Sequence, residues 1–348
     1  MRCWIALLLA GTLPLSAAER AIEKPLSHIA FGSCLKQMNP APIWETIVAA
    51  EPELFIFLGD NIYADTRDPD ELREKWKMLA ASPGYRALKS TCPILATWDD
   101  HDYGWNDAGK EFEIRQESQA IFLDFFDEPA GSPRRKREGV YDYRTFGPSG
   151  RRVQIILLDT RYHRGPLRKG PNFEERGEGR EGTYLPNSDA DAGMLGDAQW
   201  HWLEARLREP AELRIIGSSI QLISNEHRYE KWGNLPLERD RFLKLLKTTE
   251  AQGVLILSGD RHTAEVSRMD ADLGYPLYDI TSSSLNQVHR WRNELNPHRV
   301  GNMFFEENFG VLSIDWNAAD PVVRVQIRDL AGRVRMQVRH SLSELRRH

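Results

Sequence analysis

Four side chains in the sequence are of types that bind metal ions, and their spacing can bring them together. Asp60 and Tyr63 are three residues apart, so one turn of chain can aim both at the same point. Asp260 and His262 are two residues apart and point the same way if their segment is extended. At pH 7, deprotonating a tyrosine costs about 4 kcal/mol and a cysteine about 2 kcal/mol. A site that used Tyr63 and Cys34 together would therefore need a strong Lewis acid, and phenolate, thiolate and histidine favour ferric iron over magnesium.

A second group of polar side chains lies in residues 99–107, which hold five acids or amides and one histidine beside tryptophans. Together with Asp60 and Asp260, Asn106 of this segment offers hard oxygen ligands that suit calcium or manganese. An aspartate that bound both kinds of ion would bridge them, and two metals about 3.5–4 Å apart can clamp a phosphoryl group in transfer. His101 would then be free to act as a general acid or to hold a phosphoryl oxygen.

Most of these polar groups directly follow short apolar runs that are typical of strands buried on both faces. Six such runs end at polar residues, and we expect their ends to meet at one edge of one sheet, where ligands bind in open α/β folds. Asp60 alone would be explained equally well as a turn former after Gly59. The six runs are residues 28–31, 54–58, 93–98, 153–158, 213–216 and 254–257.

The remaining chain is predicted to supply helices, a small antiparallel unit and one irregular insertion. Residues 161–193 show no clear period, which indicates a functional lid or a mobile segment, and the basic run 134–137 is expected to be a solvated loop. The last segments alternate in polarity and predict an edge hairpin of a second sheet. Helices are expected over 41–50, 70–80, 110–127, 197–209 and from 236, and the alternating segments are 310–316, 321–328 and 333–340.

The N-terminus has the pattern of a secretory signal. Arg2 precedes an apolar stretch over residues 4–15 that is too short to span a bilayer, and small residues predict cleavage after Ala18. We therefore expect a signal peptide at 1–18, a single domain at 19–348 and a secreted or periplasmic protein without a transmembrane anchor. The net charge of −5 over 348 residues carries no signature of nucleic-acid binding.

Two cysteines remain once Cys3 is removed with the signal, and the sequence allows two interpretations of them. In an oxidising compartment, Cys34 and Cys92 can form a disulfide. Alternatively, Cys34 is a thiolate ligand at a strand end, and Cys92 is a buried free thiol.

As an ordered set, the motifs resemble the alkaline phosphatase D (PhoD-like) family of calcineurin-like metallophosphoesterases. The resemblance runs from about residue 27 to 315. Its central motifs are Gly32-Ser33-Cys34, Gly59-Asp60-Asn61-Ile62-Tyr63, Trp98-Asp99-Asp100-His101-Asp102 and Ser258-Gly259-Asp260-Arg261-His262. Supporting motifs are Leu158-Asp159-Thr160-Arg161, Leu195-Gly196-Asp197-Ala198-Gln199-Trp200, Leu237-Glu238-Arg239-Asp240-Arg241 and Thr281-Ser282-Ser283-Ser284.

This resemblance implies a four-layer α/β/β/α sandwich with mixed sheets and a secreted phosphomonoesterase or phosphodiesterase. Many members carry an N-terminal β-sandwich, but here the first expected strand begins at residue 28, ten residues after the predicted signal, so we expect this chain to lack that domain. His101 falls at the position of the catalytic histidine. Asp100 replaces an asparagine ligand of the wider superfamily and is either a ligand or a supporting residue. By position, the iron ligands would be Cys34, Asp60, Tyr63 and His262, and the calcium ligands Asp60, Asn106 and Asp260.

The sequence also allows other metals and other functions. Zinc or manganese can replace iron and calcium. The enzyme can be a phosphodiesterase dedicated to a polymer or a phospholipid, with the insertion 161–193 forming a deeper groove. A hypothesis of a different functional class is a metal-free secreted binding protein that is stabilised by a Cys34–Cys92 disulfide.

Overall fold

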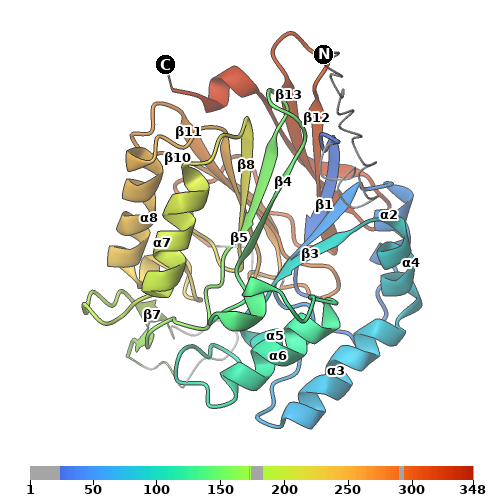
Figure 1. Ribbon diagram of the computed structural model, residues 1–348, viewed down its shortest axis with the longest axis vertical. Coiled ribbons are helices and arrows are strands. Elements are labelled where there is room, and N and C mark those ends of the chain that lie inside the picture. The colour runs from blue at the N-terminus through green and yellow to red at the C-terminus, as the bar shows by residue number, and fades with distance from the viewer. Residues whose placement is uncertain (1–23, 172, 174–182, 290–293, 348) are drawn as a thin grey trace, which may run out of the picture.

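The structure is a computed structural model that describes residues 24–171, 173, 183–289 and 294–347. The signal expected at residues 1–18 lies outside the described residues. Two six-stranded sheets form the centre of the molecule, and helices lie on their outer faces (Figure 1). Within the described part of the chain, every helix is too short or too polar to cross a bilayer.

The first sheet is mixed and has the strand order β14-β13-β12-β1-β2-β3. Its parallel part is β1, β2 and β3, and β12 joins β1 in antiparallel fashion. The strands are β1 (His28–Gly32), β2 (Leu54–Leu58), β3 (Ile94–Thr97), β12 (Asn308–Asp315), β13 (Val322–Asp329) and β14 (Val334–Ser341).

The second sheet is also mixed and has the order β10-β11-β9-β8-β5-β4. Its central strands are parallel, and β4 and β10 pair antiparallel at the two edges. The strands are β4 (Asp142–Phe146), β5 (Val153–Leu157), β8 (Leu213–Ser218), β9 (Val254–Ser258), β10 (Ala264–Asp270) and β11 (Pro276–Ser282). A separate short hairpin pairs β6 (Arg168–Lys169) with β7 (Tyr184–Leu185).

The helices fall into two outer layers. The first sheet is covered by α2 (Ile43–Ala49), α3 (Pro69–Ala81), α4 (Pro83–Thr91) and α6 (Arg115–Phe125), and the second by α7 (Gly196–Leu207) and α8 (Pro236–Thr248). The short helices are α5 (Asp100–Tyr103), η1 (Pro133–Lys136), η3 (Trp232–Asn234) and η4 (Leu342–Leu345).

Strand β2 shows why its apolar run is unbroken. Its alternate residues Leu54, Ile56 and Leu58 pack in the core between the two sheets. Phe55 and Phe57 point the other way, into the core beneath the helices. Since successive side chains of a strand face opposite sides, only a strand covered on both faces needs apolar residues at every position. The packing confirms the predicted four-layer α/β/β/α sandwich.

Two predictions about the sheets were wrong. The six polar strand ends do not share one sheet, because β1, β2 and β3 belong to the first sheet and β5, β8 and β9 to the second. The C-terminal strands do not begin a second sheet, because β12 pairs with β1 and extends the first sheet, with β13 and β14 beyond it. The period of a strand predicts its burial but not its neighbour, which depends on residues far away in the chain.

The expectations for the two charged segments also needed correction. In the basic run, Arg134 is only 7% exposed, and its guanidinium pairs with Glu128 at 3.2 Å and donates to the carbonyl of Val140. The insertion 161–193 begins with Arg161 and Arg164, which are both buried. Arg134, Arg161 and Arg164 are therefore parts of the interior and not of a solvated loop, whereas a lid or mobile segment over the rest of 161–193 stays a prediction.

Candidate metal centre

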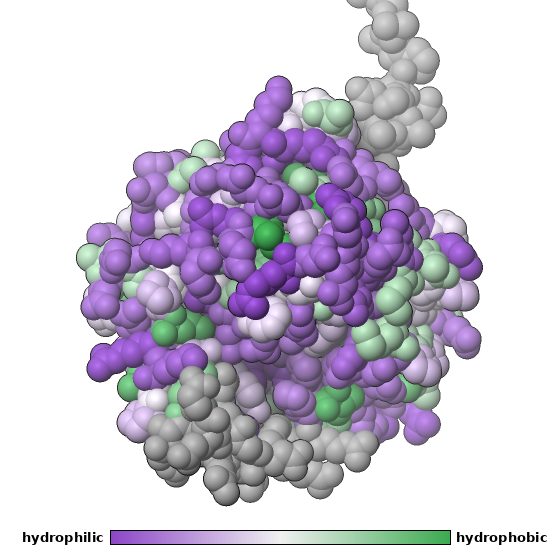
Figure 2. Space-filling view, turned by 90° about the horizontal axis from the view of Figure 1, so that it is seen from below, coloured by the Kyte–Doolittle hydropathy of each residue, from purple (hydrophilic) through white to green (hydrophobic). Residues whose placement is uncertain are grey.

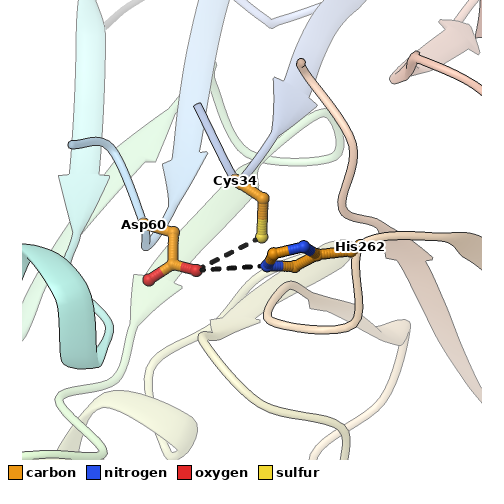
Figure 3. A group of neighbouring side chains, drawn as sticks. All are labelled: Cys34, Asp60 and His262. Atoms are coloured by element: carbon orange, nitrogen blue, oxygen red, sulfur yellow. Dashed lines mark hydrogen bonds and ion pairs between the residues drawn. The ribbon is translucent and has the colours of Figure 1, made fainter. Parts of the chain in front are cut away.

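Cys34, Asp60 and His262 lie in the turns that follow β1, β2 and β9, and their side chains point toward one another (Figure 3). Asp60 Oδ2 is 3.4 Å from Cys34 Sγ and 3.9 Å from His262 Nε2. All three residues have positive φ values, between 50° and 60°, so each strand ends in a sharp turn. The first sheet thus supplies two of these groups, and the second sheet supplies the third.

The Tyr63 hydroxyl completes this cluster. It donates a hydrogen bond to Asp60 Oδ2 at 3.1 Å and lies 2.9 Å from His262 Nε2. The prediction that Asp60 and Tyr63 aim at the same point is confirmed. We call Cys34, Asp60, Tyr63 and His262 the cysteine side of the site.

A second cluster adjoins the first and consists of carboxylates. Asp99, Asp100 and Asp260 each offer an oxygen within 4.8 Å of the others, and we call these three residues the carboxylate side. A third group of the same kind joins Asp60, Asp100 and His101. Asp60 and Asp100 therefore each belong to two groups, which makes the whole arrangement continuous.

His101 lies at the border of the two sides. Its Nδ1 donates to Asp65 Oδ1 at 2.7 Å, and its ring packs on the Tyr63 ring with 4.2 Å between centroids. Burial alone would lower the pKa of His101, but the carboxylates of Asp100, Asp60 and Asp65 outweigh it and raise the pKa to about 11. The imidazole is therefore held protonated and in a fixed orientation.

Gly59 and Asp102 fix the conformation of the chain where β2 and β3 end. Gly59 has a φ of 99°, and an added Cβ would come within 2.5 Å of the Asp99 Cβ, so the turn after β2 requires glycine. The carboxylate of Asp102 accepts hydrogen bonds from the backbone N–H groups of Asp60, Asn61 and Asp99 at 3.2, 3.2 and 2.6 Å. Asp102 thereby ties the end of β2 to the end of β3.

Burial sets the protonation of the candidate ligands. Burial, reinforced by Asp60, raises the pKa of the Cys34 thiol and of the Tyr63 phenol well above their usual values. Burial and neighbouring carboxylates raise the pKa values of Asp60 and Asp260 in the same way. Burial lowers the pKa of His262, which keeps the imidazole neutral and able to act as a ligand. Positive charge placed among these groups would favour the ionised thiol, phenol and carboxyl groups and would keep the His262 imidazole neutral.

These residues fit metal cations. Among the described residues, buried side-chain atoms without a hydrogen-bond partner include Asp60 Oδ1, Asp99 Oδ2, Asp260 Oδ2 and His262 Nδ1. Leaving several buried carboxylates without partners is costly, and cations are a common solution in proteins. A thiol, a phenol and an imidazole on one side, and only carboxylates on the other, suit ions of different character.

Some predicted residues take other positions than expected. Asn106 is exposed in the turn after α5 and does not share the burial of the other candidates. Asp260 and His262 do not lie in an extended segment, because both have positive φ, and they serve different sides of the site. Asp100, whose role was open, lies within two of the three groups.

The disulfide interpretation is wrong, since both cysteines are free in the structure. Cys34 follows β1, whereas Cys92 precedes β3, which runs parallel within the same sheet. The two thiols therefore lie at opposite ends of the strands. Cys92 is buried, as expected for a free thiol.

Three residues of the site were missed by the sequence reasoning. Asp99, Arg161 and Glu230 are fully or almost fully buried, and Arg161 pairs with both acids. Asp99 and Arg161 stand at polar strand ends, which was a usable signal. Glu230 precedes η3, and no feature of the sequence around it indicated a role in the site.

The face of the molecule that lies below in Figure 1 is largely polar. The carboxyl ends of the parallel strands point toward the lower part of Figure 1, where α5 and α6 lie. Seen from below, most of the coloured residues are hydrophilic, with a few apolar residues between them (Figure 2).

Comparison with known proteins gives a consistent family. A sequence model of the PhoD-like phosphatase family matches residues 29–308. Alkaline phosphatase D of Bacillus subtilis (strain 168) is 22% identical over 314 residues, a match that covers 79% of this chain and 51% of that protein. The chain thus spans about half the length of this curated relative.

Solved structures share the fold. A structure of PhoD superposes with a TM-score of 0.71 at 16% identity, covering 92% of this chain and 69% of the other. The purple acid phosphatase PPD1 of yellow lupin (Lupinus luteus) gives 0.64 at 12% identity, over 92% and 54%. A dimetal phosphatase of Danio rerio gives 0.55 at 13% identity, over 92% and 100%. Since the family match spans well over half of its residues, the chain belongs to the PhoD-like phosphatase family.

Proposed function

We propose that the protein is a secreted, metal-dependent phosphoric ester hydrolase that uses more than one metal ion and water as the nucleophile. The observation that carries this proposal is the continuity of the three ligand groups, which share Asp60 and Asp100. A protein that used a single ion would not need buried carboxylates on both sides of Asp60. The alkaline phosphatase D of Bacillus subtilis supports the proposed reaction class.

The two sides would hold different ions. Cys34, Asp60, Tyr63 and His262 would hold ferric iron, because a thiolate and a phenolate need a strong Lewis acid. Asp60, Asn106 and Asp260 would hold one or more calcium ions, as the sequence predicted. Asp100, which is grouped with Asp60 in one cluster and with Asp260 in another, would be a further ligand. Zinc or manganese are the alternatives for either position.

The chain's own residues divide the remaining work. When bound, the metal ions would activate water and stabilise negative charge on the phosphoryl oxygens. His101, oriented by Asp65, would give its proton to the leaving oxygen or hold a phosphoryl oxygen. Asp102 keeps the ends of β2 and β3 in register, so the ligands stay aligned.

Elemental analysis of the mature protein, purified without a chelator or a histidine tag, tests this proposal together with rates on p-nitrophenyl phosphate. One iron and at least one calcium per chain, with hydrolysis, is the expected result. Zinc or manganese in their place would keep the enzyme and overturn the metal assignment. Absence of stoichiometric metal and of activity after metals are added back would overturn the proposal.

A phosphodiesterase dedicated to a polymer or phospholipid is the second candidate. It is favoured by the position of the insertion, because the Tyr184 hydroxyl of β7 donates to Asp107 Oδ2 at 2.6 Å, next to Asn106. The insertion therefore packs at the rim of the site, where it can extend a groove. A rate on bis-p-nitrophenyl phosphate far above that on p-nitrophenyl phosphate would support this candidate, and similar rates would support the broader enzyme.

A further inference from the structure

Asp99 makes very unequal use of its two carboxylate oxygens. Oδ1 accepts two hydrogen bonds, from Arg161 Nε at 2.6 Å and Ser219 Oγ at 2.5 Å, and forms an ion pair with Arg161 Nη2 at 2.5 Å. Oδ2 has no hydrogen-bond partner among the described residues, although Asp99 is completely buried. A buried carboxylate oxygen without a partner normally requires a cation or a water.

The free oxygen belongs to a residue that is already grouped with two other carboxylates. Asp99, Asp100 and Asp260 offer oxygens within 4.8 Å of one another. Taking the proposed function as its basis, we propose that Asp99 is a further ligand of the cation on the carboxylate side, through Oδ2. Arg161 is its positioning residue.

Arg161 is held by more than its contact with Asp99. Its Nη1 pairs with Glu230, and Glu230 Oε1 in turn pairs with Arg164 Nε at 3.0 Å. The side chains of Arg161, Arg164 and Glu230 are at most 1% exposed. A planar guanidinium that pairs with one acid on each side holds its N–H groups in a constant direction, which a lysine ammonium cannot do.

The charge balance of this network agrees with a divalent ion. Two acids, Asp99 and Glu230, are matched by the two guanidiniums of Arg161 and Arg164. The excess negative charge of the carboxylate side then comes from Asp100 and Asp260. Asp99 would therefore add an oxygen ligand without adding uncompensated charge.

The competing explanation is that Asp99 and Arg161 form an ion pair that only stabilises the fold. The ligand role and the structural role predict different effects of substitution. In Asp99→Asn, Arg161 and Ser219 still require an acceptor, so the amide oxygen would face them and the NH₂ group would face the cation. The variant keeps the shape and most hydrogen bonds but removes the ligand. If the pair is only structural, the Asp99→Asn protein would be less stable but bind metal as before. If Asp99 is a ligand, the variant would bind the metal ion more weakly.

The test is equilibrium Ca²⁺ binding, by titration calorimetry and elemental analysis, to the full-length protein and its variants. We expect Asp99→Asn to raise the Kd of one Ca²⁺ at least tenfold while the iron content stays at the wild-type value. Arg161→Lys should raise the same Kd about 10- to 100-fold, as is usual when a residue that orients a ligand is replaced. Ser219→Ala removes one donor to Asp99 and should give a smaller rise of the same kind, which keeps the test usable if Arg161→Lys does not fold.

Arg134→Lys is the matched control, because Arg134 is a buried arginine that pairs with Glu128 outside the site. It should lower the melting temperature and leave the Kd for Ca²⁺ unchanged. Wild-type Ca²⁺ affinity in Asp99→Asn would overturn the ligand role. A fall in melting temperature without a change in Kd, in both Arg161→Lys and Ser219→Ala, would overturn the positioning role. If the wild-type protein itself bound no cation, the proposed function would fail as well, which is a distinguishable result.

Discussion

The cysteine side and the carboxylate side of the site are neighbours, but they are supported by different kinds of contact. On the cysteine side, neutral hydroxyls carry the support: Ser283 Oγ lies 3.1 Å from Cys34 Sγ and accepts the backbone N–H of His262 at 2.9 Å. On the carboxylate side, a buried guanidinium holds Asp99. Hydroxyls leave the full charge of the ligands available, whereas an arginine neutralises part of it.

This difference agrees with the proposal that the two sides hold different ions. Ionised cysteine and tyrosine need a strong, highly charged Lewis acid, and neutral supports do not compete with it. Carboxylate oxygens with partly balanced charge suit a divalent hard ion. Asp60 and Asp100 are the residues at which the two environments meet.

The largest effect is expected from replacing Asp60, the residue that belongs to both the cysteine cluster and the cluster with Asp100 and His101. Asp60→Asn should lower kcat/KM by at least about 100-fold, because one carboxylate would serve both ions. The content of both metals should fall in elemental analysis. Near-normal hydrolysis in this variant would remove Asp60 from the site.

His101→Asn should separate proton transfer from metal binding. We expect kcat for an alkyl phosphate to fall by about 10²–10⁴-fold, because a poor leaving group needs a proton. The loss should be smaller for p-nitrophenyl phosphate, and the metal content should be unchanged. Asp65→Asn, which only releases the His101 ring, should show the same pattern more weakly. An equal loss on both substrates would argue against the general-acid role.

One substitution on each side should show whether the two sides bind their metal ions independently. Cys34→Ser is expected to weaken iron binding at least about tenfold and to leave calcium in place, because a serine hydroxyl is a poor substitute for a thiolate. Asp260→Asn should weaken calcium binding and leave the iron in place. Elemental analysis of both purified variants is the measurement. If each variant lost both metals equally, the two sides would not be independent sites.

The smallest effect is expected at Cys92, which lies outside both sides. Burial raises the pKa of the Cys92 thiol to about 11, so the thiol stays protonated and slow to alkylate up to about pH 9 in the folded protein. Cys92→Ala should leave kcat/KM unchanged. A thiol count on the denatured, non-reduced protein should include both Cys34 and Cys92, whereas loss of both would reinstate the disulfide.

Much of the local structure could be read from the sequence. The unbroken apolar run 54–58 is a strand buried on both faces, and the spacing of Asp60 and Tyr63 does bring them together. Such features depend on residues within a few positions of one another, where backbone geometry leaves little choice. The motifs were also sufficient for the family.

The tertiary structure alone decided which strand ends meet. Apart from the family resemblance, no local pattern showed that Cys34 and Asp60 would follow strands of one sheet and His262 a strand of the other, and the contact between them exists only in the folded chain. Asp260 and His262, two residues apart, were separated into different sides by the positive φ of each. Arg161 and Glu230 are 69 residues apart, and nothing local marks their pairing. Contacts of this kind depend on how distant strands are packed, which no short window of sequence contains.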